Sequence, residues 1–203
     1  MSEVRICGVT EVPSFIEQYQ IKKLLSCLSK YELYDKMYGF TQSVIDLNPT
    51  YWKDPNNWMR LNMDDVSRPN LEDAPNMEEI VKGITFGASA IKAGQNLLVH
   101  CQLGLSRSPA MAIGSLLGAG ETIEGAYTRV KQVRPRINPN PLIITLIDEY
   151  LKLNGELVKY NDEFRGNNRK ELGIEYNKLM ESHLHDSKTL GIIFEQMEEL
   201  NRL

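Results

Sequence analysis

The segment "LLVHCQLGLSRSPAMAIGSLL", residues 97–117, constrains the fold of this chain more than any other. It begins with three apolar residues, passes through a turn that contains Gly104, and is small and apolar on all sides over 109–117. A strand without polar alternation is typical of a sheet covered on both faces, and a helix that is apolar all round is buried. The segment therefore predicts a strand, a tight turn and a helix at the centre of a domain.

Predicted strands and helices alternate along the rest of the chain. Strands are predicted at Val4–Gly8, 43–47 and 58–63 from compact apolar or β-branched runs. Helices are predicted at 17–34, at 77–93 before Gly94, after a Thr122 cap, and at 141–153 after an Asn140-Pro141 start. This order predicts an α/β fold with a central, mostly parallel twisted sheet flanked by helices.

The end of the chain differs in composition from what precedes it. We expect one domain over residues 1–154 and a charged, helical C-terminal extension over 155–203, where apolar residues are sparse. Near its end Ile193, Met197 and Leu200 follow helical spacing, and they could pack on the domain, on a second copy or on a partner.

Composition places the chain among ordinary globular proteins. It has 203 residues, of which 42% are hydrophobic and 25% charged, and it contains no run long enough for a membrane span. A net charge of −4 argues against nucleic acid or an anionic membrane as the main partner. Three cysteines outside any metal-ligand spacing, together with an N-terminus that has no apolar signal core, predict a cytoplasmic protein with free thiols.

The turn that begins at Cys101 has the features of an anion site. Backbone N–H groups in such a turn, and in the first turn of the following helix, point at a common centre and attract negative charge. Arg107 adds a planar fork that matches two oxygens of a tetrahedral anion. The same positive potential lowers the pKa of Cys101, whereas Cys7 and Cys27 lack this context and are expected to be inert buried thiols.

The stretch from His100 to Ser108, "HCQLGLSRS", resembles the signature loop of cysteine-dependent protein tyrosine phosphatases, and most of all the dual-specificity branch. The resemblance extends to "VIDL" at 44–47, to a strand that ends in an acid pair, and to "VRPRINPNPLIITLIDEYL" at 133–151. It covers about residues 40–153 and leaves the C-terminal extension uncovered.

The resemblance implies a role for each residue of the loop. Cys101 would attack phosphorus and form a cysteinyl-phosphate that water cleaves. Arg107 and the loop amides would bind the phosphate oxygens. Ser108 would help the sulfur leave, and His100 would order the loop and support the low thiol pKa. The loop residues concerned are Gln102, Leu103, Gly104, Leu105 and Ser106. The reaction implies no metal and no cofactor.

A general acid must protonate the leaving oxygen, and "LNMDDV" offers two carboxylates. The family pattern favours Asp65 over Asp64, and strand alternation agrees because Asp65 would fall in the loop after the strand; Asp73 is a more distant candidate. Asn140 matches an asparagine near the active-site floor of the family, and it is also a helix cap in its own right. Arg134 and Arg136 could reach a phosphorylated substrate or could be solvated charges.

The interior of the loop carries no charged side chain, which favours a phosphoprotein over a more highly charged phosphoester. We expect hydrolysis of phosphotyrosine, with phosphoserine and phosphothreonine as further substrates if the pocket is shallow. Two alternatives stay open at this point. One is a phosphatase that acts on a non-protein ester, such as an RNA 5′ end or a phosphoinositide, and the other is a non-catalytic phosphate-binding module.

Overall fold

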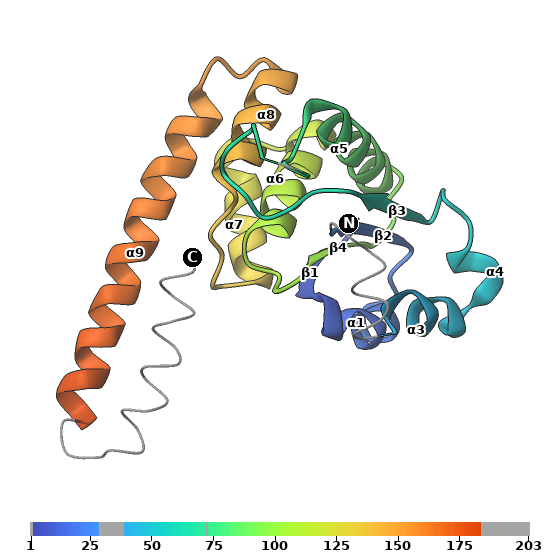
Figure 1. The fold of residues 1–203 in the computed structure, drawn as a ribbon, viewed down its shortest axis with the longest axis horizontal. Coiled ribbons are helices and arrows are strands. Elements are labelled where there is room, and N and C mark those ends of the chain that lie inside the picture. Colours follow the sequence, from blue (N-terminus) through green and yellow to red (C-terminus); the bar gives the residue numbers. More distant parts are fainter. Residues whose placement is uncertain (1, 29–38, 72, 184–203) are drawn as a thin grey trace.

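The computed structural model describes residues 2–28, 39–71 and 73–183, and for 169 and 171–183 it describes the helical backbone alone. Its centre is a four-stranded sheet in the order β1-β4-β2-β3, in which every pair of neighbours is parallel. The strands are β1 (Val4–Gly8), β2 (Lys23–Cys27), β3 (Trp58–Leu61) and β4 (Leu97–Cys101). Helices cover both faces of the sheet (Figure 1), which confirms the predicted α/β fold.

Strand β4 pairs with both β1 and β2, and all five of its residues are buried. Successive side chains of a strand point to opposite faces of the sheet. Val99 accordingly belongs to one buried hydrophobic cluster and Leu98 to the other. A strand that feeds two cores has no polar face, which is the physical reason for its continuous apolar sequence.

The helices divide between these two faces. The cluster around Val99 is completed by α5 (Met77–Lys92), α6 (Arg107–Ala119), α7 (Ile123–Val133) and α8 (Pro141–Leu151). The cluster around Leu98 is completed by α1 (Val12–Gln18), α3 (Phe40–Leu47) and α4 (Pro49–Trp52). The side-chain oxygens of Asn76, Thr122 and Asn140 cap α5, α7 and α8, so the helix starts predicted at these three places are confirmed.

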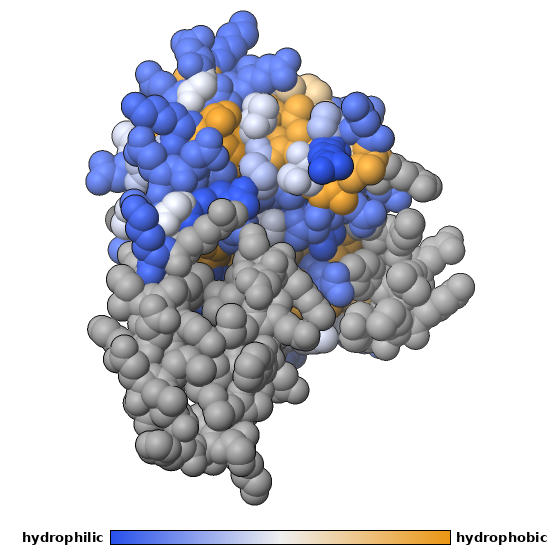
Figure 2. Space-filling model, turned by 60° about the vertical axis from the view of Figure 1, so that its left-hand side comes forward, coloured by the Kyte–Doolittle hydropathy of each residue, from blue (hydrophilic) through white to orange (hydrophobic). Residues whose placement is uncertain are grey.

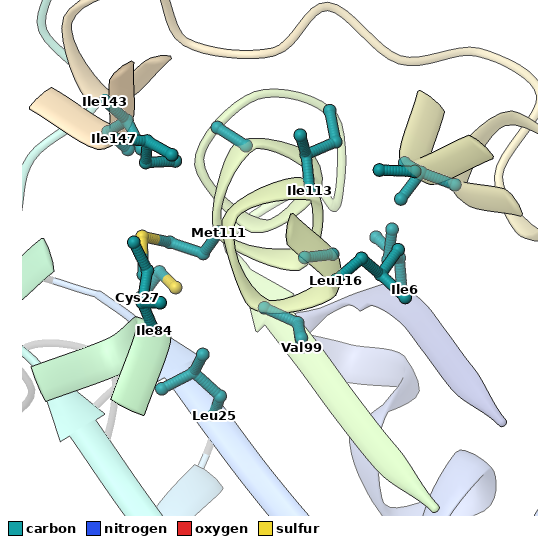
Figure 3. Close-up of a cluster of buried hydrophobic side chains, with 14 of the residues drawn as sticks. Ile6, Leu25, Cys27, Ile84, Val99, Met111, Ile113, Leu116, Ile143 and Ile147 are labelled. Carbon is teal, nitrogen blue, oxygen red and sulfur yellow. The ribbon is translucent and has the colours of Figure 1, made fainter. Parts of the chain in front are cut away.

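Helix α6 lies in the middle of the larger cluster. Figure 3 shows Met111 of α6 among side chains of the sheet, of α5 and of α8. All residues from Arg107 to Leu116 are buried, which confirms the prediction of a buried helix after the cysteine turn. The first turn of this helix is therefore held rigidly against the end of β4.

The helix predicted at 17–34 is wrong within the residues described. Helix α1 ends at Gln18, and Lys23–Cys27 forms β2 between β4 and β3. Ile21, Leu24, Leu25 and Leu28 are each no more than 3% exposed. Because a strand covered on both faces buries every residue, its apolar pattern imitates one face of a helix, and ladder pairing with two neighbours decides the outcome. The part of the prediction at 29–38 lies outside the described residues.

The strand predicted at 43–47 is also wrong, because these residues form the second half of α3. Phe40 and Val44, four residues apart, bury one face of this helix against the sheet. The ring of Phe40 lies 5.7 Å from that of Trp58, edge to face. Tertiary burial of an i, i+4 pair thus outweighs the β-branched composition of the run.

Helix α9 (Glu156–His183) follows α8 and runs beside it (Figure 1). The carboxylate of Asp148 accepts hydrogen bonds from the backbone N–H groups of Gly155 (2.8 Å) and Leu157 (2.9 Å), which fixes the start of α9. Leu157 is fully buried in the larger cluster. The stripe predicted from Ile193, Met197 and Leu200 lies outside the described residues.

The side of the molecule turned forward in Figure 2 is mostly hydrophilic where it is coloured, with smaller hydrophobic areas between. Within the described ranges, the large hydrophobic side chains that are exposed are Leu71, Leu103 and Tyr150. None of the helices in this part of the chain combines the length and the hydropathy of a bilayer span.

The substitution Leu157→Ala is expected to lower the free energy of unfolding by about 2–5 kcal/mol, because a buried leucine truncated to alanine leaves a cavity. Leu71 is 49% exposed and supplies the matched control. Leu71→Ala should change stability by less than about 0.5 kcal/mol. Urea unfolding followed by circular dichroism measures both variants, and equal losses would contradict the packing of α9 on the core.

Candidate active site

The candidate site lies at the carboxyl end of β4, where Cys101 ends the strand and Arg107 begins α6. Ligand sites of open α/β sheets typically lie at this end of the strands. Residues 102–106 form the loop between them, which we call the signature loop. The strand in the centre of the sheet and the most buried helix thus fix both ends of this loop.

Gly104 allows the loop to turn back over the sheet. Its φ angle is +76°, a conformation that residues with a Cβ disfavour. A Cβ at this position would also lie 2.6 Å from the backbone carbon of Cys7. On the other side of the turn the amide of Val9 donates to the carbonyl of Gln102 (3.1 Å). The signature loop is therefore packed against the end of β1.

The sulfur of Cys101 accepts two hydrogen bonds from this segment. The amide of Gly104 donates to Sγ at 3.3 Å and the hydroxyl of Ser108 at 3.2 Å. Burial raises the thiol pKa, but the charge of Arg107 and the donors on Ser108 and Gly104 outweigh it, so the pKa of Cys101 is lowered. Burial raises the pKa of Cys7 and of Cys27 by more than the charges of Arg134 and Arg107, respectively, lower it. The lowered pKa distinguishes Cys101 from both.

The guanidinium of Arg107 is only 3% exposed, which is unusual for an arginine. One terminal nitrogen donates to the carbonyl oxygen of Met63 at 2.9 Å, and Nε lies 3.8 Å from a carboxylate oxygen of Asp65. Both partners come from the chain that leaves β3. The planar group is thus held in one orientation beside the sulfur before any substrate binds.

The structure brings Asp65 to the signature loop. Its Oδ1 accepts hydrogen bonds from the hydroxyl of Ser106 (2.7 Å) and from the side-chain amide of Asn140 (2.8 Å). The neighbouring Asp64 is tied through its backbone, since its N–H donates to the carbonyl of Asp73 at 2.7 Å. Asp65 is the carboxylate that these contacts hold at the loop, which is the position the sequence favoured for a general acid.

Asn140 caps a helix and also contacts Asp65. Its Oδ1 caps α8 by accepting from the amides of Leu142 (3.0 Å) and Ile143 (3.1 Å). Its Nδ2 donates to Asp65 and, at 3.2 Å, to the carbonyl of Val66. One side chain therefore couples the start of α8 to the loop that carries Asp65.

His100 lies beneath the loop in a fully buried polar pair. Its Nε2 is 2.5 Å from the hydroxyl oxygen of Ser26, which also accepts from the indole N–H of Trp58 at 2.8 Å. Burial, with a smaller contribution from Arg107, lowers the pKa of His100 to about 3. The imidazole is neutral near pH 7, so the positive charge that stabilises a Cys101 thiolate comes from Arg107 instead.

Sequence reasoning missed three residues that support the site. Ser26 contacts His100, and Trp58 in turn donates to Ser26. Glu11 accepts hydrogen bonds from the amide of Gly8 (2.7 Å) and from Arg134 (3.3 Å). Arg134 in turn donates to the carbonyl of Leu103 at 2.9 Å, so it contacts the loop backbone. Ser26, a polar residue inside the apolar run of β2, is a signal in the sequence that could have indicated the contact with His100. The contact between Glu11 and Arg134 joins residues too far apart in the sequence to be predicted from a local pattern. Arg136 is exposed.

Residues 10–152 match the family "Dual specificity phosphatase, catalytic domain". The chain belongs to this family. The tyrosine-protein phosphatase vhp-1 of Caenorhabditis elegans is 28% identical over 134 residues, which are 66% of this chain and 18% of that protein. The match spans between 5% and 36% of the length of curated relatives such as this one.

Solved structures share the fold of the dual-specificity phosphatase domain described above. A crystal structure of PTPMT1 has a TM-score of 0.53 at 19% identity and covers 79% of this chain and 95% of its own. A structure of PTPMT1 in complex with PI(5)P has a TM-score of 0.51 at 18% identity, with 74% and 90% covered. At these identities the likeness establishes the fold.

Gly104→Ala is expected to destabilise the phosphatase domain more than Gly94→Ala. Both glycines have a positive φ, +76° and +71°, but a Cβ at Gly94 meets nothing within 4 Å. Both variants therefore lose about 1 kcal/mol to backbone strain. Gly104→Ala loses about 1–3 kcal/mol more through overpacking against Cys7. Urea unfolding compares the two, and equal losses would contradict the close approach of the signature loop to β1.

Cys101 is expected to react with iodoacetamide before Cys7 or Cys27 near neutral pH, because only its pKa is lowered. Ser108→Ala removes a hydrogen bond to the thiolate, raises its pKa and slows alkylation at about pH 6.5 by about threefold to tenfold. At higher pH the alkylation rates of Cys101 in the wild type and in Ser108→Ala should become equal, because the thiol is ionised in both proteins.

Ser115→Ala is the control for this experiment, because Ser115 is buried on the same helix and donates to the carbonyl of Met111. It should keep the wild-type profile when peptide mass spectrometry follows alkylation over a range of pH. Faster labelling of Cys27 than of Cys101 would refute the assignment of the lowered pKa.

Proposed function

We propose that this protein is a phosphoprotein phosphatase that hydrolyses phosphotyrosine, and also phosphoserine and phosphothreonine, through a cysteinyl-phosphate intermediate. The observation that carries the proposal is the pair of donors on the sulfur of Cys101, from Gly104 and Ser108, with Arg107 beside it and Asp65 held over the loop. This arrangement supports a nucleophile, an oxyanion site and an acid in one place.

In the first step the Cys101 thiolate attacks phosphorus, and the bond between phosphorus and the leaving oxygen breaks. The backbone amides of the signature loop and the guanidinium of Arg107 bind the non-bridging oxygens, whose charge is stabilised in the transition state. The carboxyl group of Asp65 gives its proton to the leaving oxygen, so the alcohol departs neutral. Ser106 and Asn140 orient that carboxyl group.

In the second step water attacks the phosphorus of the cysteinyl-phosphate, and the Asp65 carboxylate takes a proton from that water. The bond between sulfur and phosphorus breaks, and inorganic phosphate leaves. The sulfur departs as a thiolate, which the Ser108 hydroxyl stabilises by its hydrogen bond. Arg107 stabilises the same thiolate electrostatically, and the enzyme returns to its initial state.

The surface of the signature loop supports this choice of substrate class. Gln102 and Leu103 are exposed, and Leu103 shows 60% of its surface to solvent. An uncharged loop with an exposed apolar side chain suits a phosphate monoester on an aromatic or aliphatic residue better than a polyanion.

A non-protein phosphoester is the second candidate. The observation in its favour is that PTPMT1, whose fold this chain shares, has been solved in complex with PI(5)P. A panel of a phosphotyrosine peptide, a phosphothreonine peptide, a phosphoinositide and a 5′-phosphorylated RNA separates the two. Preferential hydrolysis of the phosphoinositide or the RNA would overturn the phosphoprotein assignment. A panel without any turnover, despite phosphate binding, would leave the non-catalytic module.

Hydrolysis of para-nitrophenyl phosphate tests the mechanism. Cys101→Ser is expected to lower kcat by more than about 10³-fold, because the nucleophile is lost. Asp65→Asn should lower kcat by about 10²-fold, whereas Asp64→Asn, the matched control next to it, should stay close to wild type.

Two further conditions complete the test. EDTA should leave the rate unchanged because no step uses a metal, and vanadate should inhibit as an analogue of the transferred phosphoryl group. An active Cys101→Ser protein would overturn the covalent mechanism. A loss confined to Asp64→Asn would move the acid to that residue.

A further inference from the structure

Helix α9 begins after the residues that match the phosphatase family, 10–152, and yet it contacts the active-site framework. The contact is made through the connection between α7 and α8, residues 134–140. We call this segment the α7–α8 connection. The connection binds the signature loop on one side and α9 on the other, so α9 can affect the site through it.

On one side the α7–α8 connection holds the signature loop at three carbonyls. Arg134 donates to the carbonyl of Leu103 (2.9 Å), the amide of Asn138 to that of Leu105 (2.7 Å) and the amide of Asn140 to that of Ser106 (3.2 Å). A carbonyl fixed from outside leaves the neighbouring N–H groups free to face the anion site. Through its side chain, Asn140 also holds Asp65.

On the other side α9 holds the α7–α8 connection. The side-chain amide of Asn168 donates to the carbonyl of Ile137 at 2.9 Å, and its oxygen accepts from the ammonium group of Lys131 at 3.4 Å. Ile137 itself is 3% exposed. The carbonyl that Asn168 holds is joined directly to the nitrogen of Asn138, so this hydrogen bond fixes the peptide plane that contacts the signature loop.

Asn168 is held in place by the preceding turns of the same helix. The hydroxyl of Tyr127 donates to the side-chain oxygen of Asn161 at 2.8 Å, and both residues are no more than 1% exposed. The rings of Tyr160 and Phe164 lie 4.8 and 4.9 Å from that of Tyr127. These buried contacts set the rotation of α9 about its axis, and with it the direction of Asn168.

We infer that Asn168 is a positioning residue of the active site, which acts through the α7–α8 connection on Asn140 and Asp65. Its consequence for catalysis rests on the proposed function. Loss of the hydrogen bond to Ile137 should loosen the connection, so that Asp65 spends less time where it can protonate a leaving oxygen. Because Asn140 also binds Asp65, the step that needs the acid should be slowed most.

Three variants of the full chain test this inference. Asn168→Ala removes both hydrogen bonds, and Asn168→Asp keeps the shape and the acceptor for Lys131 but loses the donor to Ile137. Asn167→Ala is the matched control, because Asn167 is the same residue type on the same turn and is exposed.

The first measurement is the dependence of kcat on the leaving group. Phenyl phosphate needs protonation of a basic phenolate, whereas para-nitrophenyl phosphate releases a weak base that needs the acid less. Asn168→Ala and Asn168→Asp should each lower kcat for phenyl phosphate by about threefold to tenfold, the effect of one hydrogen bond, and should change that for para-nitrophenyl phosphate less. Asn167→Ala should change neither.

The second measurement is hydrogen exchange at the amides of Asn138 and Asn140, which needs no turnover. Exchange there should accelerate by about threefold to tenfold in both Asn168 variants and stay unchanged in Asn167→Ala. Exchange and leaving-group dependence identical to those of Asn167→Ala would overturn the inference. So would an equal loss of kcat on both esters with a lowered unfolding midpoint, since that pattern belongs to general destabilisation.

The two proposals fail in distinguishable ways. A wild-type protein without phosphatase activity would refute the proposed function, and exchange at Asn138 and Asn140 would then still decide whether Asn168 holds the α7–α8 connection. An active wild type whose Asn168 variants match the control would refute the positioning role alone.

Discussion

A thiolate at Cys101 is a negative charge at the end of the most buried strand of the sheet, and much of the surrounding structure serves to stabilise it. Burial alone would keep the proton on the sulfur, as it does for Cys7 and Cys27. The compensation comes from one short segment: the amide of Gly104, the hydroxyl of Ser108 and the charge of Arg107. These groups act on the sulfur only because α6 starts there and is itself packed on all sides.

The remaining parts of the site are positioned relative to this segment by side chains that join one element to another. Arg107 binds the carbonyl of Met63 and lies against Asp65, and Asn140 both caps α8 and binds Asp65. Glu11 joins the end of β1 to Arg134, which holds the signature loop. Each such side chain ties two elements together, so the signature loop, the segment that carries Asp65 and the sheet are held as one unit. The contact between Asn168 and Ile137 extends the same construction to α9.

The success of the sequence predictions varied with how local their physical basis is. The helices at α5, α7 and α8 follow from a 3.6-residue apolar period within one segment, together with a Gly94 stop for α5 and with caps at Thr122 and Asn140 for the other two. These predictions are confirmed. The helix predicted across β2 and the strand predicted within α3 are both wrong. Leu24 and Leu25 are buried on opposite faces of the sheet, and Val44 is buried together with Phe40 in the cluster on one face. No pattern within five residues can show which partners will cover them.

The sequence by itself determined the chemistry that one segment can hold: Cys101, Gly104, Arg107 and Ser108 are close together because a strand, a turn and a helix follow each other within eight residues of chain, 101–108. Only the tertiary structure decided that Ser106 and Asn140 bind Asp65, and that a neutral His100 contacts Ser26, which Trp58 holds in turn. It likewise decided that α9 touches the framework of the site. The reason is that hydrogen bonds between distant segments depend on how the sheet and its helices pack, and that arrangement is set by the whole buried core at once.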